Sequence, residues 1–556
     1  MTGGTVVPAR FQPPLPLDRL LVPHGAEGAG DQLEMDVLFV GAGPAGLAGA
    51  IELANLVRRD NAAGGGLGEV QIGVLEKAEA LGEHSLSGAV VNPRAFRELF
   101  PELEDSDFPF RGPVSKESVY LLTARGKLPI PTPPTMHNKS YYVASLCEMV
   151  RWLGQKAEAL GVNLFTGFPA AALLVEGERV MGVRTAATGT DRDGKPLANY
   201  MAPNDLTAKV TALAEGTRGM LAQAFFEWRR IASENPQIFA LGVKEIWETR
   251  RPLDRVIHTL GWPLPPDAFG GSFMYPLEPN LVALGLVVGL DYRDAALDVH
   301  VLLQRMKQHP LFAGYLAGGE LVEWGAKTIP EGGYYAVPSR RSGDGVVVLG
   351  DSAGFVDVPS LKGIHYAMQS GIEAARAIFA ALKAGDCSAA RLGAYDVAMN
   401  GSYVMDDLHR TRNMRLAFKD GFWAGGVRAG LMTLTGGRFP GGKIAMERDA
   451  EVARLAGAAL TPGESPGSPG ISKVDAVFKS GNATRDTIPT HLVIGRDVPA
   501  EVARFYAHLC PAGVYEEVDG VLRVNAPNCV DCKATDVLGP RWTPREGGSG
   551  PKYKRM

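Results

Sequence analysis

The sequence predicts an α/β fold in which a Rossmann-like nucleotide domain is interleaved with a second domain and followed by a small C-terminal module. A strand, a glycine-rich loop, a helix and a second strand follow one another over residues 36–76, as in the first unit of a dinucleotide-binding fold. A further strand and glycine turn occur at 344–354, before a helical run. A Pro- and Gly-rich stretch at 461–470 then separates off a module with three of the five cysteines.

Composition and charge place the chain among ordinary globular proteins. Its 556 residues suggest roughly two to four domains, and 46% of them are apolar. The net charge of −4 argues against nucleic acid as the main partner. Five cysteines without a secreted pattern indicate a reducing compartment. The first residues, 1–34, are rich in Pro and Gly, lack the pattern of a signal peptide, and are expected to form a loose arm.

The first glycine loop predicts a bound dinucleotide. The loop Gly41-Ala42-Gly43-Pro44-Ala45-Gly46 follows an apolar strand and opens a helix. The first glycine permits the tight turn, the second lets the backbone approach a pyrophosphate, and the third lets helix pack on strand. The start of the helix offers free N–H groups and a positive dipole end to the phosphates. Glu76 ends the next strand, where a carboxylate can bind ribose hydroxyls.

Two later stretches favour FAD as the dinucleotide. The strand 344–349 ends in Gly350-Asp351 and turns at Gly354, and an aspartate at this point of an FAD enzyme contacts the ribityl or phosphate part. Asp351 could instead be a helix N-cap. The stretch 212–219 is typical of the third flavin-enzyme signature. No second strand, Gly-x-Gly-x-x-Gly and helix unit follows, so we expect no NAD(P)H site and electrons from another donor.

The C-terminal cysteines predict a metal cluster. Cys529 and Cys532 form C-x-x-C, and Cys510 precedes a proline upstream. Thiolates arranged around turns can hold an iron–sulfur cluster or zinc. Cys147 and Cys387 lie in helical or linker contexts and are expected to be plain thiols.

Over residues 36–556 the chain resembles the electron transfer flavoprotein–ubiquinone oxidoreductase family. The resemblance rests on blocks that occur in order, among them LGEHSLSGAVVNPRAFRELFP, GGSFMYP, EGGYYAVP, LKGIHYAMQSG and CPAGVYE. It implies one FAD, one 4Fe–4S cluster in a ferredoxin-like module, and attachment to one face of a membrane. It also implies that electrons pass from reduced electron transfer flavoprotein to a quinone.

The chain departs from the family pattern at one cluster position. The family motif is C-x-x-C-x-x-C, whereas Thr535 stands here in place of the last cysteine. The three remaining thiolates can hold a 3Fe–4S cluster, or a 4Fe–4S cluster whose fourth iron takes oxygen from Asp536, Thr535 or water. Loss of the cluster is the alternative, against which the intact surrounding loop argues.

The segment 412–439 mixes Arg and Lys with Phe, Trp, Leu and Met, which is typical of a helix lying in a membrane interface. A buried helix with a basic edge has a similar composition. No run reaches the ~18–20 apolar residues of a spanning helix, and 281–290 is predicted to be a buried strand. By resemblance, Gly270 and Gly271 hold the quinone headgroup, although they could be only a strand kink. His365 is a weak candidate for proton donor, since a core histidine has the same pattern.

These observations predict a membrane-surface oxidoreductase without a nucleophile or acid–base pair, facing a reducing compartment such as the bacterial cytoplasm. Two alternatives stay open: a flavin reductase of another substrate with a vestigial cluster, and a docking subunit that turns over nothing alone. The expected parts are an arm at 1–34, the interleaved FAD and quinone domains at 35–455 (with about 205–330 mostly quinone domain), a linker at 456–470 and the cluster module at 471–556.

Overall fold

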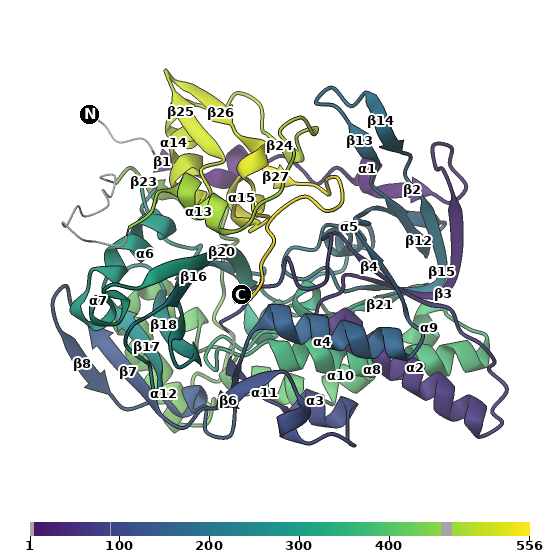
Figure 1. The fold of residues 1–556 in the computed structure, drawn as a ribbon, viewed down its shortest axis with the longest axis horizontal. Coiled ribbons are helices and arrows are strands. Elements are labelled where there is room, and N and C mark those ends of the chain that lie inside the picture. The colour runs from purple at the N-terminus through teal and green to yellow at the C-terminus, as the bar shows by residue number, and fades with distance from the viewer. Residues whose placement is uncertain (1–4, 89, 458–469) are drawn as a thin grey trace.

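The computed structural model describes residues 5–88, 90–457 and 470–556 (Figure 1). Most of the expected linker at 456–470 therefore lies outside the described residues. Two large sheets lie side by side, and the C-terminal module sits above them in the view of Figure 1.

The nucleotide sheet is built as the glycine pattern predicts. β3 (Gln32–Val40) leads through the loop to α2 (Pro44–Ala62), and β4 (Ile72–Glu76) returns parallel beside β3. The sheet order is β10-β4-β3-β15-β12-β11-β2, with β22 beside β15. Its other strands are β10 (Asn163–Thr166), β15 (Asp205–Leu213), β12 (Arg179–Thr185), β11 (Ala170–Glu176), β2 (Leu21–Pro23), β22 (Val346–Val348) and β21 (Ser342–Gly343), which pairs with β22.

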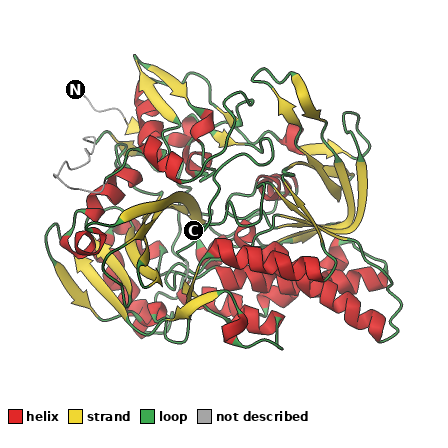
Figure 2. Ribbon diagram, viewed as in Figure 1, coloured by secondary structure: helices red, strands yellow, loops and turns green. Residues whose placement is uncertain are grey.

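Helices cover one face of this sheet, as Figure 2 shows. α2 packs against α4 (Leu146–Ala159) and α8 (Ile364–Ala384). Glycines let α2 and α8 approach closely, because a Cβ on Gly371 would overlap the Ala45 carbonyl oxygen. This contact brings the starts of both helices to the same edge of the sheet.

The second sheet forms the other wall of the site. Its order is β20-β16-β19-β18-β17-β7-β8, and its neighbours are antiparallel except for β17 and β7. Its strands are β20 (Glu320–Pro330), β16 (Phe239–Glu248), β19 (Leu281–Gly289), β18 (Gly270–Glu278), β17 (Val256–Gly261), β7 (Glu117–Leu122) and β8 (Lys127–Ile130). β19 is buried along almost its whole length, which confirms the strand expected at 281–290.

The N-terminal segment is packed on the fold rather than loose. β1 (Thr5–Val6) pairs with β23 (Arg454–Leu455), and β2 extends the nucleotide sheet beside β11. Val6, Leu15 and Leu20 are buried. All three side chains join the main hydrophobic core, but their spacing follows neither a helical nor a strand period, so it did not predict this packing.

The C-terminal module surrounds the cysteines. Its elements are α13 (Lys473–Lys479), β24 (Leu492–Val493), α14 (Ala500–Leu509), β25 (Tyr515–Val518), β26 (Val521–Val524), α15 (Ala534–Leu538) and β27 (Arg541–Trp542). The last residues return to the two sheets, where Tyr553 and Met556 are buried and the Tyr553 hydroxyl accepts the Ala326 N–H at 3.3 Å. This tail fixes the module against the rest of the protein.

Candidate active site

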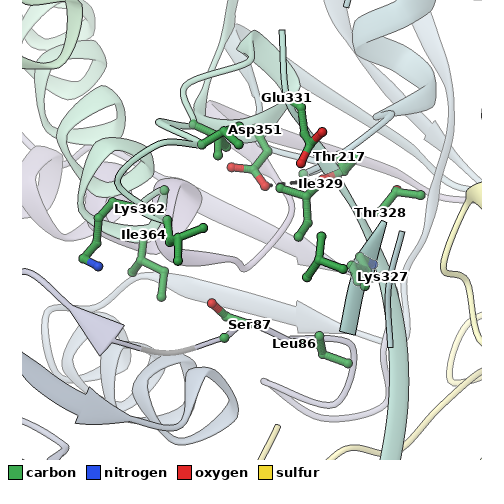
Figure 3. Close-up of a pocket in the computed structure, with 18 of the residues that line it drawn as sticks. Leu86, Ser87, Thr217, Lys327, Thr328, Ile329, Glu331, Asp351, Lys362 and Ile364 are labelled. Atoms are coloured by element: carbon green, nitrogen blue, oxygen red, sulfur yellow. Dashed lines mark hydrogen bonds between the residues drawn. The ribbon is translucent and has the colours of Figure 1, made fainter. Parts of the chain in front are cut away.

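One cavity of about 680 Å³ connects the glycine loop with the second sheet. Most of the residues expected to bind cofactor or quinone line it: Gly41, Gly43, Pro44, Ala45, Glu76, Gly350, Asp351, Gly270 and Gly271. The two sheets form its walls, and Figure 3 shows side chains from β20, the α8 region and the loop before β5 (Val90–Val91) converging on it. The expected nucleotide and quinone residues therefore share one space.

The glycine loop is shaped by close backbone contacts. Gly41 has φ +110°, and a Cβ there would overlap the Ala214 carbonyl oxygen. A Cβ on Gly43 would meet nothing within 4 Å and would occupy open space above the α2 N-terminus. Gly46 does not line the cavity, because it packs on Gly41. The three glycines thus divide between shaping the loop and leaving room for a ligand.

Glu76 is held at the rim by backbone donors. Its carboxylate accepts the Ala42 N–H at 3.2 Å and the Ala78 N–H at 2.9 Å. These bonds fix the carboxylate beside the loop, where its remaining lone pairs can accept ribose hydroxyls.

Asp351 points into the cavity and caps no helix. α8 begins at Ile364 with Gly363 as its N-cap, so the capping alternative is wrong for Asp351. Its carboxylate accepts the Thr217 hydroxyl at 3.4 Å, as Figure 3 shows, and burial raises its pKa to about 6. Gly354, at φ +82°, lies off the cavity against Gln237.

Five lysines line the cavity, and the sequence predicted none of them: Lys77, Lys244, Lys327, Lys362 and Lys533. Burial lowers the pKa of Lys244, Lys327 and Lys362 to about 8 and that of Lys533 to about 7. Lys244 donates to the Ser87 carbonyl at 2.9 Å, and Lys362 donates to Asn138 Oδ1 at 2.8 Å. Figure 3 places Lys327 and Lys362 on opposite sides of the pocket. Their charge makes the cavity suitable for an anionic ligand. Lys244 at the centre of an apolar strand was the available signal.

The helix α12 (Phe422–Leu434) closes the apolar end with two distinct faces. Phe422, Gly426, Ala429, Gly430 and Thr433 line the cavity. Large apolar side chains point outward on another face: Trp423, Val427, Leu431 and Leu434, which are 67%, 68%, 44% and 85% exposed. Among the described residues, no helix is long and apolar enough to cross a membrane.

Only part of the expected interfacial segment 412–439 is exposed. Met414, Arg415 and Leu416 are buried. Arg415 donates to Glu331 at 2.6 Å and to Asp291 at 2.9 Å, and Arg415 and Glu331 both line the cavity. The expectation of a basic and aromatic surface over this whole segment was therefore wrong for its first part. Composition could not separate a buried ion pair from a surface arginine.

Gly270 and Gly271 open β18, where both line the cavity. A Cβ on Gly270 would overlap the Val287 carbonyl oxygen, and one on Gly271 would lie 2.5 Å from the Thr259 carbonyl oxygen. Close strand packing therefore requires both glycines. His365 also lines the cavity, and burial lowers its pKa to about 3, so its ring is neutral near pH 7.

A second, smaller pocket collects the three expected cluster ligands. Cys510, Cys529 and Cys532 line it together with Thr535, and all three cysteines are buried free thiols. The loop bends around the pocket through Asp531 and Lys533, which have left-handed backbones at φ +53° and +63°. Burial raises the pKa of Cys529 to about 12. Thiolates at this place therefore need a cation, and the donor set suits a metal cluster.

The two side chains expected to offer oxygen to a fourth iron, Thr535 and Asp536, lie in different places in the structure. Thr535 lies at the pocket, with its hydroxyl 3.4 Å from that of Tyr515. Asp536 does not line the pocket. Its carboxylate accepts a hydrogen bond from Arg218 Nε at 2.7 Å and another from the backbone N–H of Trp542 at 3.1 Å. The hypothesis that Asp536 is a cluster ligand was wrong, because these donors turn the carboxylate away.

His491, Cys529 and Asp531 also gather, with one possible ligand atom of each within 4.8 Å of the others. Asp531, however, pairs with Lys77 at 2.5 Å and Arg545 at 2.9 Å. Burial alone would raise the pKa of Asp531, but these cations outweigh it and hold the pKa well below its usual range. The carboxylate is thus committed to ion pairs. Cys147 lies apart from both pockets, and burial raises the pKa of its thiol to about 12, as for a plain core cysteine.

The fold and these two pockets define a flavin-type oxidoreductase that carries a cysteine-ligated cluster module. Two family models match the chain: the ubiquinone-binding part of ETF-QO over residues 239–329, and the 4Fe-4S part of electron transfer flavoprotein-ubiquinone oxidoreductase over 470–554. The mitochondrial human protein of that name is 37% identical over 94% of this chain and 89% of its own length. The Pseudomonas aeruginosa protein is 36% identical over 95% of this chain and all of its own. The chain belongs to the electron transfer flavoprotein–ubiquinone oxidoreductase family, as its sequence blocks predicted.

Solved structures support the fold alone. A geranylgeranyl bacteriochlorophyll reductase-like protein from Thermoplasma acidophilum aligns with a TM-score of 0.56 at 18% identity, over 73% of this chain and 92% of that chain. A flavin-dependent brominase aligns with a TM-score of 0.50 at 18% identity, over 73% and 94%. These proteins share the two-sheet flavoprotein architecture and confirm the predicted fold class.

Proposed function

We propose that this protein passes electrons from reduced electron transfer flavoprotein to ubiquinone or another quinone at a membrane surface. One observation carries the proposal: a single cavity joins the dinucleotide loop to an exposed apolar helix, and a three-cysteine pocket adjoins it. FAD and an iron–sulfur cluster, when bound, would supply electron carriers between a protein donor and a two-electron acceptor.

The chain's own residues would hold FAD at the closed end of the cavity. Gly41, Gly43, Pro44 and Ala45 present the loop and the α2 N-terminus to the pyrophosphate, and Glu76 accepts ribose hydroxyls. Gly350 and Asp351 line the same cavity and would contact the ribityl or phosphate part of FAD. Lys327 and Lys244 place positive charge in the same cavity, which stabilises an anionic ligand in a water-poor space. Gly46 and Gly354 do not line the cavity, and they would support the site through the packing of its loops.

The quinone would enter at the apolar end. Gly270 and Gly271 offer backbone groups to its head, and the small residues on the inner face of α12 leave room for its tail. The outward face of α12 would lie in the membrane interface, where exposed Trp423 and Leu434 gain from leaving water. Monotopic attachment through this helix would bring the cavity mouth to the lipid. We propose that the protein is attached to the membrane face that borders a reducing compartment, such as the bacterial cytoplasm.

The cluster would be held by Cys510, Cys529 and Cys532 alone. Thr535 lines the same pocket and Asp536 does not, so the chain would offer no fourth thiolate or carboxylate there. We therefore propose that the cluster would be 3Fe–4S after exposure to air. The family's 4Fe–4S form would then need water or the Thr535 hydroxyl on its fourth iron. A corner without a thiolate is the most exchangeable position of such a cluster.

Turnover by the purified, loaded protein tests the proposal. Electron transfer flavoprotein is kept reduced by a dehydrogenase and its substrate, and a short-chain quinone in detergent is the acceptor. We expect quinol formation that depends on both. A loaded protein that forms no quinol would favour the docking-subunit alternative, and a protein with FAD but no iron would favour the vestigial-cluster alternative.

A further inference from the structure

The two pockets meet at one aromatic side chain. Among the described residues, Lys533 and Trp542 alone line both the large cavity and the cysteine pocket. Trp542 is 4% exposed and lies on β27, which follows α15 in the cluster module. Trp542 therefore lies in the wall of both the cofactor cavity and the thiol pocket.

The indole is fixed in this position by charge. Its Nε1–H donates to Asp531 Oδ1 at 2.9 Å, and Asp531 lies between the cluster ligands Cys529 and Cys532. The ammonium of Lys77 lies 4.8 Å from the ring centroid, and that of Lys533 lies 4.5 Å from it. Lys77 follows Glu76 at the cavity rim, so its contact with the ring joins Trp542 to the part of the cavity beside the dinucleotide loop. Cation–π contacts and a charge-assisted hydrogen bond restrict the tilt of the ring.

We infer that Trp542 is the bridge through which single electrons pass between the cluster and the flavin. The inference rests on the proposed function, because it requires both centres to be bound. A packed π-system couples two redox centres better than an equal length of saturated side chain, and Lys533 offers only a saturated chain. In each transfer one electron leaves one centre and arrives at the other. The indole is neither oxidised nor reduced, and no proton moves.

A competing route exists on the same face. The Thr328 N–H donates to the Cys532 carbonyl at 3.0 Å, and Thr328 lines the large cavity. This hydrogen bond offers electrons a path from Cys532 to β20 that does not include the indole of Trp542. Substitution of Trp542 separates the two routes, because it leaves this backbone hydrogen bond in place.

The test compares W542F, W542M and the wild type as full-length holoproteins. Phe keeps an aromatic ring, whereas Met fills apolar space without one. A flash-generated reductant delivers less than one electron per protein, and absorbance and freeze-quench EPR follow its redistribution between cluster and flavin. Reduction potentials of both centres and the iron and FAD contents are measured on the same samples.

We expect W542M to slow redistribution by about tenfold or more and W542F to slow it less, with potentials and cofactor contents unchanged. A W542M protein with wild-type redistribution would overturn the inference and favour the Thr328 route. If W542M loses its cluster, W542L serves as a second variant without an aromatic ring. Wild-type rates of redistribution in both W542F and cluster-loaded W542L would then overturn the inference, whereas a slower rate in either variant would support it. Absence of cluster or flavin from the wild type would instead refute the proposed function.

Discussion

Replacement of Thr535 by cysteine should convert the cluster site into a four-thiolate site. Thr535 lines the cysteine pocket, and its hydroxyl makes only a long, 3.4 Å contact with Tyr515. Loss of that contact should cost at most about 1 kcal/mol of folding free energy. The cysteine side chain lacks the methyl group of threonine, and its sulfur takes the position of the threonine hydroxyl beside the pocket. The T535C protein should therefore fold normally and bind about four irons per FAD, against about three in the air-purified wild type.

EPR and iron analysis measure this conversion. The wild type should show a signal as isolated, typical of an oxidised 3Fe–4S cluster, and T535C should show a signal only after reduction. T535V is the matched control, because it keeps the shape and adds no ligand. It should keep the wild-type signal and iron content. A wild type that retains four irons through oxidation, or a T535C protein with the wild-type spectrum, would refute the three-thiolate reasoning.

Three further predictions concern the other parts of the site. G43A should lose most of its FAD, because its Cβ fills only ligand space, and as an apoprotein it should melt as the wild-type apoprotein does. G41A should also lose about 1–3 kcal/mol of stability, and equal melting of the two apo variants would contradict this. The W423S/L434S variant should bind vesicles at least about tenfold more weakly than the wild type and should still reduce a soluble quinone normally. The control variant V397S, changed at an exposed residue of another helix, should bind vesicles as the wild type does. Undiminished vesicle binding by W423S/L434S would exclude α12 as the anchor. D531N should lower the free energy of unfolding by about 3–5 kcal/mol, because it leaves Lys77 and Arg545 without their buried anion, and E79Q at the surface should change it little. Since the folded pKa of Asp531 is depressed, its contribution should be complete above about pH 4 and lost as the pH falls through the folded pKa; denaturation curves that fall equally in D531N and wild type would contradict this.

Local patterns predicted the parts of the site that depend on backbone shape. Gly41, Gly43 and Glu76 follow from a strand, turn and helix sequence whose geometry needs those residues. The cysteine spacing and the Thr535 replacement likewise predicted one pocket with three thiols. The glycine and cysteine patterns are local in sequence, although Gly41 also packs against the distant Ala214, and the importance of Thr535 was implied by the family resemblance.

Contacts between distant segments could not be predicted in this way. Lys327 and Lys244 enter the cavity from the second sheet. A lysine within an apolar strand, as at Lys244, marks an unusual position, but the local sequence does not show which cavity the side chain enters. Asp536 looked like a cluster ligand because it follows Thr535, yet Arg218, more than 300 residues earlier, directs it elsewhere. Trp542 became notable only when the two pockets were seen to share it. Tertiary ion pairs decide these orientations, and a single sequence does not record them.

The most direct test of the proposed relay is the quinol yield in vesicles that contain ubiquinone. Reduced electron transfer flavoprotein is added anaerobically in limiting amount to the loaded protein bound on their surface. The relay predicts one quinol for each electron pair delivered, and none without the protein or with vesicles that lack quinone. Full reduction of the bound FAD without quinol formation would contradict it.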